Sequence, residues 1–300
     1  MTGKQIDKPA KLCIYHANCM DGFTAAWVFW RFCRQNGTEV EFLPAAYGDA
    51  PPEVIGRDVV IVDFSYPLQA LEHMMAVATS VTLLDHHKSA QEDLSKLNVR
   101  DNSMVEFDME RSGAGLAWDT FFHGTPRPKL VDYVEDRDLW RFDHKFTKVV
   151  HACLSSQEPD FEMWERIMEA LETPEGLATI GIEGAAILRK HDRDVVEIVQ
   201  STRRTMVIGG HLVPVANVPP CWASDAGHLM AKDPGVPFSA TYFDMDGARK
   251  FSLRSHRHEG HDLPHDVSAV AKQYGGGGHR PAAGFTAPQG WEGEQPLGDG

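Results

Sequence analysis

The sequence lacks the features of a membrane-spanning, secreted or disulfide-stabilised protein. No stretch approaches the ~18 consecutive apolar residues that a membrane span requires. Its five cysteines are an odd number and contain no CxxC pair, which is typical of a reduced compartment rather than a disulfide framework. The first residues, "MTGKQIDKPAK", are polar and have no apolar signal-peptide core. We therefore expect a cytoplasmic protein that binds no membrane.

Basic charge is also scarce. The 29 Lys and Arg residues face 43 Asp and Glu residues, for a formal net charge of −14. Proteins that hold long nucleic acids do so by neutralising many phosphates, so this balance argues against a long duplex as ligand. A nucleic-acid substrate would have to be short and held by local Arg side chains or metal ions.

The chain is long enough for two domains, and its pattern changes along its length. Apolar runs at 11–15, 58–65 and 80–87 alternate with amphipathic stretches, which predicts a parallel sheet covered on both faces. Residues 111–200 have a helical pattern that ends in a long connecting helix. The predicted fold class is α/β, with a parallel-sheet N-terminal domain and a helical connector.

The last third predicts a second, smaller α/β domain with a mixed sheet. Alternating runs flank an Asp-Gly pair at 246–247, which indicates a hairpin. The Gly- and Pro-rich end has the composition of a disordered segment. We predict a first domain at 1–200, a second at 201–287 and a disordered tail at 288–300.

Polar side chains cluster where the predicted strands end. The segments are "YHANCMDG" (15–22), "VIVDFS" (60–65), "TLLDHHK" (82–88) and, in a helical stretch, "YVEDRDLW" (133–140). Each alone has an ordinary explanation, since Asp63 could cap a helix and a His pair after a strand more often faces solvent than binds a metal. Together they would crowd carboxylates and imidazoles at one sheet edge, where ligands of such folds bind. Two divalent cations about 3.5–4 Å apart, sharing one carboxylate, would neutralise that charge.

These four segments resemble the N-terminal motifs of the DHH phosphoesterases. The second half adds "FSLRS" (251–255) and "DVSAVAKQYGGGGHRPAAGF" (266–285), which look like the signature of the C-terminal domain associated with that family. The resemblance covers residues 11–287, with six motifs in order. It is greatest for the nano-RNase (oligoribonuclease B-like) and cyclic-nucleotide phosphodiesterase branch.

The resemblance implies a residue for each role at the metal site. Asp63 would bridge two cations; the other ligands would be His16 for one metal and Asp21, His86 and Asp136 for the other. Asp136 is preferred to Asp138 because the family's fourth motif begins with its ligand Asp. Asp85 would orient a His from outside the ligand set, and His87 would face the scissile phosphate. The mixed donor set favours Mn²⁺, with Mg²⁺, Co²⁺ or Zn²⁺ as alternatives.

The C-terminal motifs imply a substrate-binding surface. A Gly run is often a flexible linker, but "GGGGH" (275–279) lies between a predicted helix and apolar "AAGF". Bare backbone at Gly276, Gly277 and Gly278 would let peptide N–H groups approach a phosphate. By resemblance, His279 contacts the phosphate, and Arg254 with Ser255 grips the end phosphate or the adjoining nucleotide.

The predicted function is hydrolysis of phosphodiester bonds in short oligonucleotides (nano-RNA) or cyclic (di)nucleotides by two-metal-activated water, a 3′-5′ exonuclease-like activity. Asp63, His87, Arg254 and His279 are the catalytic candidates. The alternatives are a phosphomonoesterase acting on pAp, a pyro- or polyphosphatase, and a nucleotide-binding sensor with a degenerate site. A monomer and a homodimer both stay open, as does a cellular or viral source.

One position departs from the family pattern. Many relatives have an Asp two residues before the Asp of the first motif, and this chain has Cys19. Cys19 could ligate as a thiolate, leave a gap for water or weaken the first site. A thiolate would shift the metal preference toward Zn²⁺ or Fe²⁺. We favour a Cys that does not ligate, because His16 and Asp63 remain to hold the ion.

Overall fold

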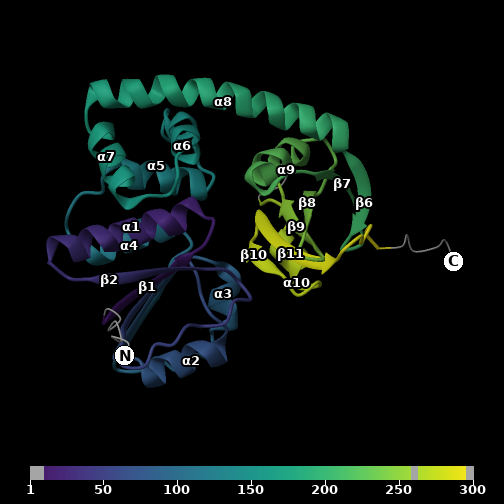
Figure 1. Cartoon of the computed structure of the whole chain (residues 1–300). Coiled ribbons are helices and arrows are strands. Elements are labelled where there is room, and N and C mark those ends of the chain that lie inside the picture. Colours follow the sequence, from purple (N-terminus) through teal and green to yellow (C-terminus); the bar gives the residue numbers. More distant parts are fainter. Residues whose placement is uncertain (1–9, 258–262, 295–300) are drawn as a thin grey trace, which may run out of the picture. The chain divides into compact units, whose positions relative to one another are not determined.

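The computed structural model describes residues 10–257 and 263–294, which form two compact units (Figure 1). The first unit comprises Met1–Leu188 and the second Arg189–Gly300. The boundary lies inside helix α8 (Pro174–Thr202), whereas the sequence analysis placed it at the end of the same helix. The architecture is α/β, with a parallel sheet in the first unit and a mixed sheet in the second.

The first unit is built on a five-stranded sheet in the order β2-β1-β3-β4-β5, in which every neighbouring pair is parallel. This is the sheet that the apolar runs predicted. Its elements are β1 (Lys11–His16), α1 (Met20–Gln35), β2 (Val40–Ala45), β3 (Asp58–Val62), α2 (Leu68–Val77), β4 (Ser80–Asp85), α3 (Lys88–Asp93), β5 (Ser103–Phe107), α4 (Gly113–Phe121), α5 (Lys129–Asp138), α6 (Thr147–Ser155) and α7 (Phe161–Leu171).

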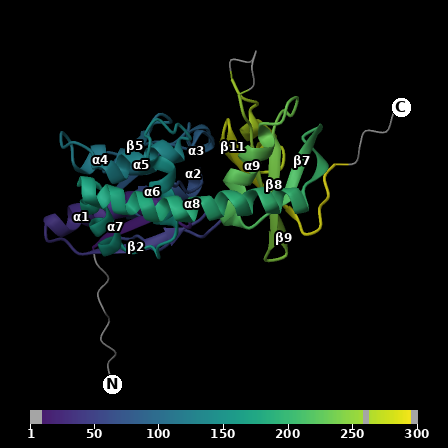
Figure 2. The same ribbon diagram turned by 90° about the horizontal axis from the view of Figure 1, so that it is seen from above.

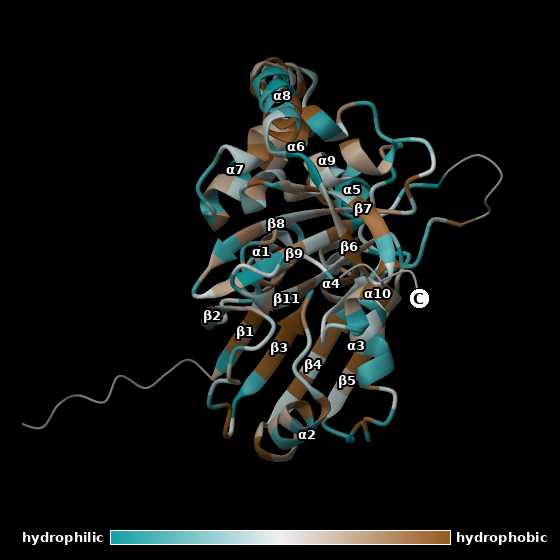
Figure 3. Cartoon of the chain, turned by 90° about the vertical axis from the view of Figure 1, so that its right-hand side faces the viewer, coloured by the Kyte–Doolittle hydropathy of each residue, from teal (hydrophilic) through white to brown (hydrophobic). Residues whose placement is uncertain are grey.

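Both faces of this sheet are buried, which explains the continuous apolar runs. Leu12 and Ile14 of β1 belong to the core that α2 covers, together with Leu71. Cys13, which points the other way, belongs to the core formed with α1, α4, α5, α6 and α7, together with Trp27. Strand side chains alternate between the two faces, and the strands are accordingly among the most apolar segments of the chain (Figure 3).

Helix α8 runs without interruption for 29 residues (Figure 2). Ile180, near its start, packs into a core of the first unit, and Val195 and Val199 pack into a core of the second. Charged side chains occupy much of its remaining surface. Among the described residues, no helix combines the length and apolarity needed to cross a membrane.

The second unit holds a six-stranded sheet in the order β10-β11-β9-β8-β7-β6, with β7 and β8 parallel and the other pairs antiparallel. The predicted hairpin is confirmed: Asp246 and Gly247 join β8 to β9 with φ values of 54° and 74°, as a tight primed turn requires. The elements are β6 (Arg204–Ile208), β7 (His211–Asn217), the 3-10 helix η1 (Pro220–Trp222), α9 (Ala223–Ala231), β8 (Ser239–Met245), β9 (Ala248–Arg254), α10 (Val267–Lys272), β10 (Gly277–His279) and β11 (Ala282–Pro288).

The segment after β11 is packed, so the expectation of a disordered tail is wrong for residues 288–294. The ring of Trp291 lies 5.2 Å from that of Phe251. Glu292 accepts a hydrogen bond from Arg249 at 2.7 Å, and Glu294 accepts one from the backbone of Gly210 at 2.8 Å. An aromatic anchor and two paired carboxylates therefore hold a stretch whose composition suggested disorder. Residues 295–300 lie outside the described residues.

Candidate metal centre

The candidate site lies at the carboxyl ends of the central strands of the first unit. His16 is the last residue of β1, Asp63 directly follows β3, and His86 and His87 follow β4. In the sheet order, β2 lies on one side of β1, whereas β3 and the strands after it lie on the other side. The position between β1 and β3 is therefore a topological switch point. In open parallel sheets a crevice forms at such a point, because the connections that follow the two neighbouring strands run to opposite faces of the sheet. His16 and Asp63 flank this point.

Asp63 is at the centre of the cluster. Its Oδ1 lies 3.0 Å from Nε2 of His86, and its Oδ2 lies 3.4 Å from Nδ1 of His16. Its backbone N–H donates to the carbonyl of Leu84 at 2.9 Å, and its φ is 56°. Non-glycine residues adopt this left-handed conformation at a cost and mostly where the surroundings enforce it. The turn after β3 therefore aims this carboxylate back over the sheet edge.

Two groups of three potential ligands share Asp63. The first is His16, Asp63 and His87, and the second is Asp21, Asp63 and His86; within each group, one donor atom per residue lies within 4.8 Å of the others. Asp21 lies in the first turn of α1, where its Oδ2 is 3.8 Å from Nε2 of His86. One carboxylate common to two donor sets suits a pair of neighbouring divalent cations.

The burial of the donors fits a metal better than it fits a solvated polar cluster. Asp21, Asp63 and His86 are each at most 2% exposed. His16 Nδ1 and Asp63 Oδ2 are buried, and neither atom makes a hydrogen bond within the described residues. Buried polar atoms are normally paired, so two facing orphans indicate a missing partner. Carboxylate oxygens and imidazole nitrogens are suitable donors for divalent cations.

The electrostatics of the cluster point the same way. Burial raises the pKa of Asp21, and the charges of Asp63 and Asp138 raise it further. Burial also acts to raise the pKa of Asp63, but the close contacts with His16 and His86 and the charge of these two residues outweigh it and hold this pKa well below its usual range. Burial acts to lower the pKa of His86, yet the three carboxylates raise it to about 10. The cluster therefore attracts positive charge, which a proton supplies when no cation does.

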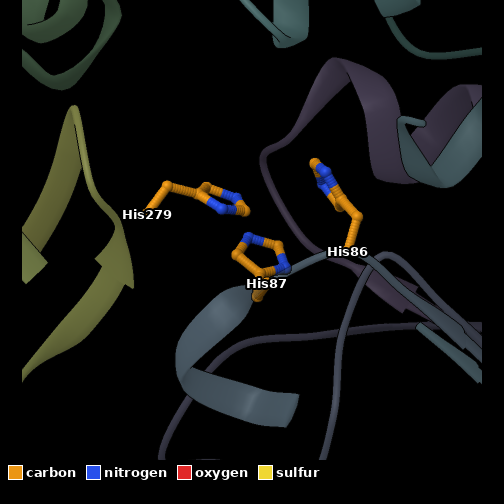
Figure 4. Close-up of side chains that lie close together, drawn as sticks. All are labelled: His86, His87 and His279. Carbon is orange, nitrogen blue, oxygen red and sulfur yellow. The ribbon is translucent and has the colours of Figure 1, made fainter. Parts of the chain in front are cut away.

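Asp85 holds His87 in place. Its Oδ1 lies 2.7 Å from Nδ1 of His87 and accepts the backbone N–H groups of His86 at 2.7 Å and His87 at 3.2 Å. The hydroxyl of Ser65 donates to the other oxygen. Figure 4 shows His86 and His87 leaving the chain at adjacent positions, with His87 at the start of α3. A carboxylate behind an imidazole orients its ring and sets its tautomer.

Asp138, and not Asp136, lies beside the cluster, which corrects the sequence-based preference. Oδ2 of Asp138, the last residue of α5, is 3.6 Å from Nε2 of His86. Asp136 is 4% exposed and accepts hydrogen bonds from the backbone of Asp143 at 2.8 Å and His144 at 3.1 Å, and from a Thr hydroxyl. Residues two apart on a helix point in different directions, so only one could reach the sheet edge.

Cys19 lies next to the cluster, directly before α1, where it occupies the N-cap position without a side-chain cap. Burial raises the pKa of its thiol, and the charges of Asp63, Asp138 and Asp21 raise it further. Among the described residues, no group of three potential ligands includes Cys19. These surroundings favour a neutral thiol, because the thiolate would be one more negative charge among carboxylates.

Two of the predicted substrate-binding residues come at the end of β9 in the second unit. The guanidinium of Arg254 donates to the hydroxyl of Ser224 at 2.8 Å and to the carbonyl of Leu253 at 2.8 Å. Ser255 is 3% exposed, and its hydroxyl donates to the carbonyl of His265 at 2.7 Å. The hydroxyl of Ser255 is thus used in a hydrogen bond to the protein backbone, which is a structural role that its motif did not indicate.

The glycines before His279 are required by strand packing. A Cβ on Gly276 would lie 2.1 Å from the carbonyl oxygen of Gly284, and one on Gly278 would lie 2.6 Å from that of Ala282. Gly278 also has a φ of 137°. Gly277 pairs with Gly284, and His279 with Ala282, in the β10 to β11 ladder. Gly277–His279 are therefore ordered strand rather than flexible linker, as the flanking segments suggested, and the lack of side chains at Gly276 and Gly278 lets this segment approach β11.

The sequence did not predict that two glycines of the first unit are needed at the site. A Cβ on Gly113 would lie 2.5 Å from the Cβ of Asp63, and one on Gly22 would lie 2.6 Å from the carbonyl oxygen of His16. The N–H groups of Gly113 and Ala114 donate to the carboxylate of Asp21 at 2.6 and 3.0 Å. The small residues after the N-cap serine in "SGAG" (112–115) were the available signal, since a helix start is a ready anion site.

Comparison with known proteins gives limited likenesses. No protein-family model matches the chain. The uncharacterized protein R106 of Acanthamoeba polyphaga mimivirus is 29% identical over an alignment 297 residues long, which covers 91% of this chain and 66% of that protein. The chain thus spans just under two thirds of the length of this relative.

Three solved structures are similar over most of the chain. An exopolyphosphatase-related protein from Bacteroides fragilis has a TM-score of 0.49 and 14% identity, covering 95% of this chain and 87% of its own. The pGpG-specific phosphodiesterase PggH from Vibrio cholerae has a TM-score of 0.47 and 13% identity, covering 93% of each chain. RecJ from Thermus thermophilus, in complex with Mn²⁺, has a TM-score of 0.47 and 13% identity, covering 93% of this chain and 50% of its own. Likenesses of this size do not assign the chain to a family.

Proposed function

We propose that the chain is a divalent-metal-dependent phosphoesterase of the DHH family that hydrolyses phosphodiester bonds of short oligonucleotides or cyclic (di)nucleotides. The observation that carries the proposal is the position of Asp63, which belongs to two groups of three potential ligands at one sheet edge. The order of motifs along the chain agrees with it. The net charge of −14 favours a short substrate over a long duplex.

In this proposal Asp63 is shared by two cations. His16 holds one of them, and Asp21, His86 and Asp138 hold the other. Mn²⁺ is the preferred metal because hard carboxylates and borderline imidazoles are mixed in one donor set. When bound, such a pair of cations supplies Lewis-acid charge and activates water for attack on phosphorus.

The surrounding residues would position the phosphate and balance its charge. Burial acts to lower the pKa of His87, but the carboxylate of Asp85 outweighs it and raises this pKa. A protonated imidazole held by Asp85 is suited to donate a hydrogen bond to a phosphoryl oxygen. Arg254 and His279 of the second unit are proposed as further phosphate contacts, since a guanidinium binds phosphate in bidentate fashion.

The test is a hydrolysis panel in manganese-supplemented buffer. The substrates are labelled dinucleotides, cyclic dinucleotides, pAp, bis-p-nitrophenyl phosphate and pyrophosphate, and bound metal is counted by inductively coupled plasma mass spectrometry. The proposal expects about two Mn²⁺ per chain and faster turnover of a dinucleotide than of pyrophosphate. Faster turnover of pyrophosphate or pAp would reassign the chain to the alternative phosphatase classes. Nucleotide binding without hydrolysis of any substrate would make it a sensor.

A further inference from the structure

Tyr47 is an exposed aromatic residue beside the candidate metal centre. Its ring centroid lies 5.6 Å from that of His16, 5.9 Å from that of His87 and 5.1 Å from that of Phe64. Its exposed fraction is 53%. The rings of His16, Phe64 and His87 meet that of Tyr47 at angles of 76°, 56° and 80°, so none of the three stacks face to face with it. More than half of the residue's surface stays open.

A short turn after β2 holds Tyr47 in this position. The N–H of Ala46 donates to the side chain of Asp49 at 2.8 Å, and the N–H of Asp49 donates to the carbonyl of Ala46 at 3.1 Å. Gly48, between them, has a φ of 98°, which suits glycine alone. Pro51 and Pro52 follow and restrict the backbone further. The ring therefore stands on a locally constrained support.

Tyr47 is much more exposed than the aromatic residues that follow β3 next to it. Phe64, which touches it, is 1% exposed, and Tyr66 is 2% exposed; both belong to the core on the α2 side of the sheet. Single exposed apolar residues are common and need no explanation by themselves. Tyr47 differs because its neighbours are His16, a candidate metal ligand, and His87, which the proposed function places against the scissile phosphate.

We propose that Tyr47 is the residue on which a nucleobase of the substrate stacks, a proposal that rests on the proposed function of this site. In a nucleotide only one sugar lies between the base and its phosphate. The ring of Tyr47 is in direct contact with the rings of His16 and His87, so a phosphate held at these residues would bring its base close to Tyr47. Stacking on an aromatic ring tolerates any base, since every base has a π face. This would make Tyr47 a specificity-determining residue that favours nucleotides over inorganic pyrophosphate and polyphosphate.

The test compares two substitutions at Tyr47 with a control. Tyr47→Ala removes the ring and Tyr47→Phe keeps it, while Ile55→Ala truncates another exposed side chain of the same unit, 66% exposed. The substrates are a dinucleotide, the same dinucleotide with both bases removed, and bis-p-nitrophenyl phosphate. Binding is measured separately by equilibrium dialysis with a purine nucleoside monophosphate and with inorganic phosphate, and bound Mn²⁺ is counted for every variant.

We expect Tyr47→Ala to raise the KM for the dinucleotide about tenfold or more, equivalent to about 1.4 kcal/mol. The kcat should change little, because stacking binds ground state and transition state alike. Tyr47→Phe and Ile55→Ala should behave as wild type. The base-free dinucleotide should bind to wild type as weakly as the intact dinucleotide binds to Tyr47→Ala. In dialysis, Tyr47→Ala should bind the nucleoside monophosphate more weakly than wild type does and should bind inorganic phosphate equally well.

Two kinds of failure are distinguishable. If wild type hydrolyses the dinucleotide and Tyr47→Ala does so with unchanged KM and full metal content, the stacking role is wrong and the proposed function stands. If wild type hydrolyses no nucleotide, the proposed function is wrong and the role of Tyr47 falls with it. A Tyr47→Ala variant that loses bound Mn²⁺ would overturn the stacking role in favour of support for His16 and His87.

Discussion

Nε2 of His86 lies 3.0 Å from Oδ1 of Asp63, in a contact where both residues are at most 2% exposed. On its other oxygen the same carboxylate faces His16 at 3.4 Å. A buried carboxylate is costly unless it is paired, and Asp63 also adopts a left-handed backbone conformation. Strain and buried charge at one residue indicate a functional rather than a stabilising role.

Asp63→Asn is predicted to reduce manganese-dependent turnover at least about a hundredfold, because loss of a ligand exceeds the effect of losing an outer hydrogen bond. The amide keeps the shape of the carboxylate but not its charge, so bound metal should also decrease. Asp58→Asn is the control, since Asp58 begins the same strand at the opposite end of the sheet. Wild-type turnover in Asp63→Asn would contradict the two-metal site.

The two aspartates of "EDRD" (135–138) should behave oppositely. Asp138→Asn should lower bound metal and activity with little change in thermal midpoint, because its side chain lies beside His86. Asp136→Asn should leave metal content unchanged and reduce unfolding free energy by about 1–3 kcal/mol, since a buried acceptor of several hydrogen bonds is impaired. Metal counts and urea unfolding distinguish them, and the reverse pattern would restore Asp136 as the ligand.

Gly113→Ala should disturb the site through sterics alone. The new methyl would lie 2.5 Å from the Cβ of Asp63, closer than carbon atoms approach, so either α4 or the turn carrying Asp63 must move. Activity and metal content should both decrease. Gly181→Ala in α8 is the matched control, because a Cβ there has open space, and alanine is about 0.5–1 kcal/mol better than glycine inside a helix. Equal effects of the two substitutions would argue against the steric explanation.

Cys19→Ala should retain wild-type metal stoichiometry and wild-type preference among Mn²⁺, Zn²⁺ and Fe²⁺. The reason is that no group of three potential ligands among the described residues includes Cys19, while His16 and Asp63 remain to hold the ion. Competitive metal loading followed by elemental analysis measures this. A loss of Zn²⁺ preference in the variant would show that the thiolate ligates.

The ion pair of Asp119 and Arg127 should contribute stability that acid removes. Arg127 donates to Oδ1 of Asp119 at 2.8 Å and to Oδ2 at 2.6 Å. Burial acts to raise the pKa of Asp119, but Arg127 and Arg111 together outweigh it and lower this pKa in the folded protein. A lowered folded pKa gives a contribution that is complete above the unfolded pKa of about 3.9 and disappears as the pH falls through the folded value.

The corresponding measurement compares urea midpoints of wild type and Asp119→Asn. Their difference should be constant between pH 7 and about pH 5 and should shrink below about pH 4. Asp101→Asn, at an exposed position, is the control for general effects of charge. A difference between wild type and Asp119→Asn that persists unchanged into acid would show that the pair does not provide the stability.

Much of the first unit could be predicted from local pattern. Its strands are buried on both faces, so their apolar runs are continuous, and polar residues at their ends stand out. His16, Asp63 and His86 could therefore be predicted from the sequence alone, and the parallel order of the strands brings them to one edge. Disorder was predicted wrongly for residues 288–294 because composition does not register that Trp291 packs on Phe251.

The sequence by itself determined the α/β class, the hairpin at Asp246 and Gly247, and the residues that gather at the strand ends, because these depend on periodicity and turn chemistry within a few residues. Tertiary structure alone decided that Asp138 lies beside His86, while Asp136 accepts hydrogen bonds from the following loop. It also decided that residue 113 must be a glycine and that Tyr47 contacts His16. Each of these depends on which distant segment lies opposite a side chain. Sequence spacing carries no information about such contacts until the chain has folded.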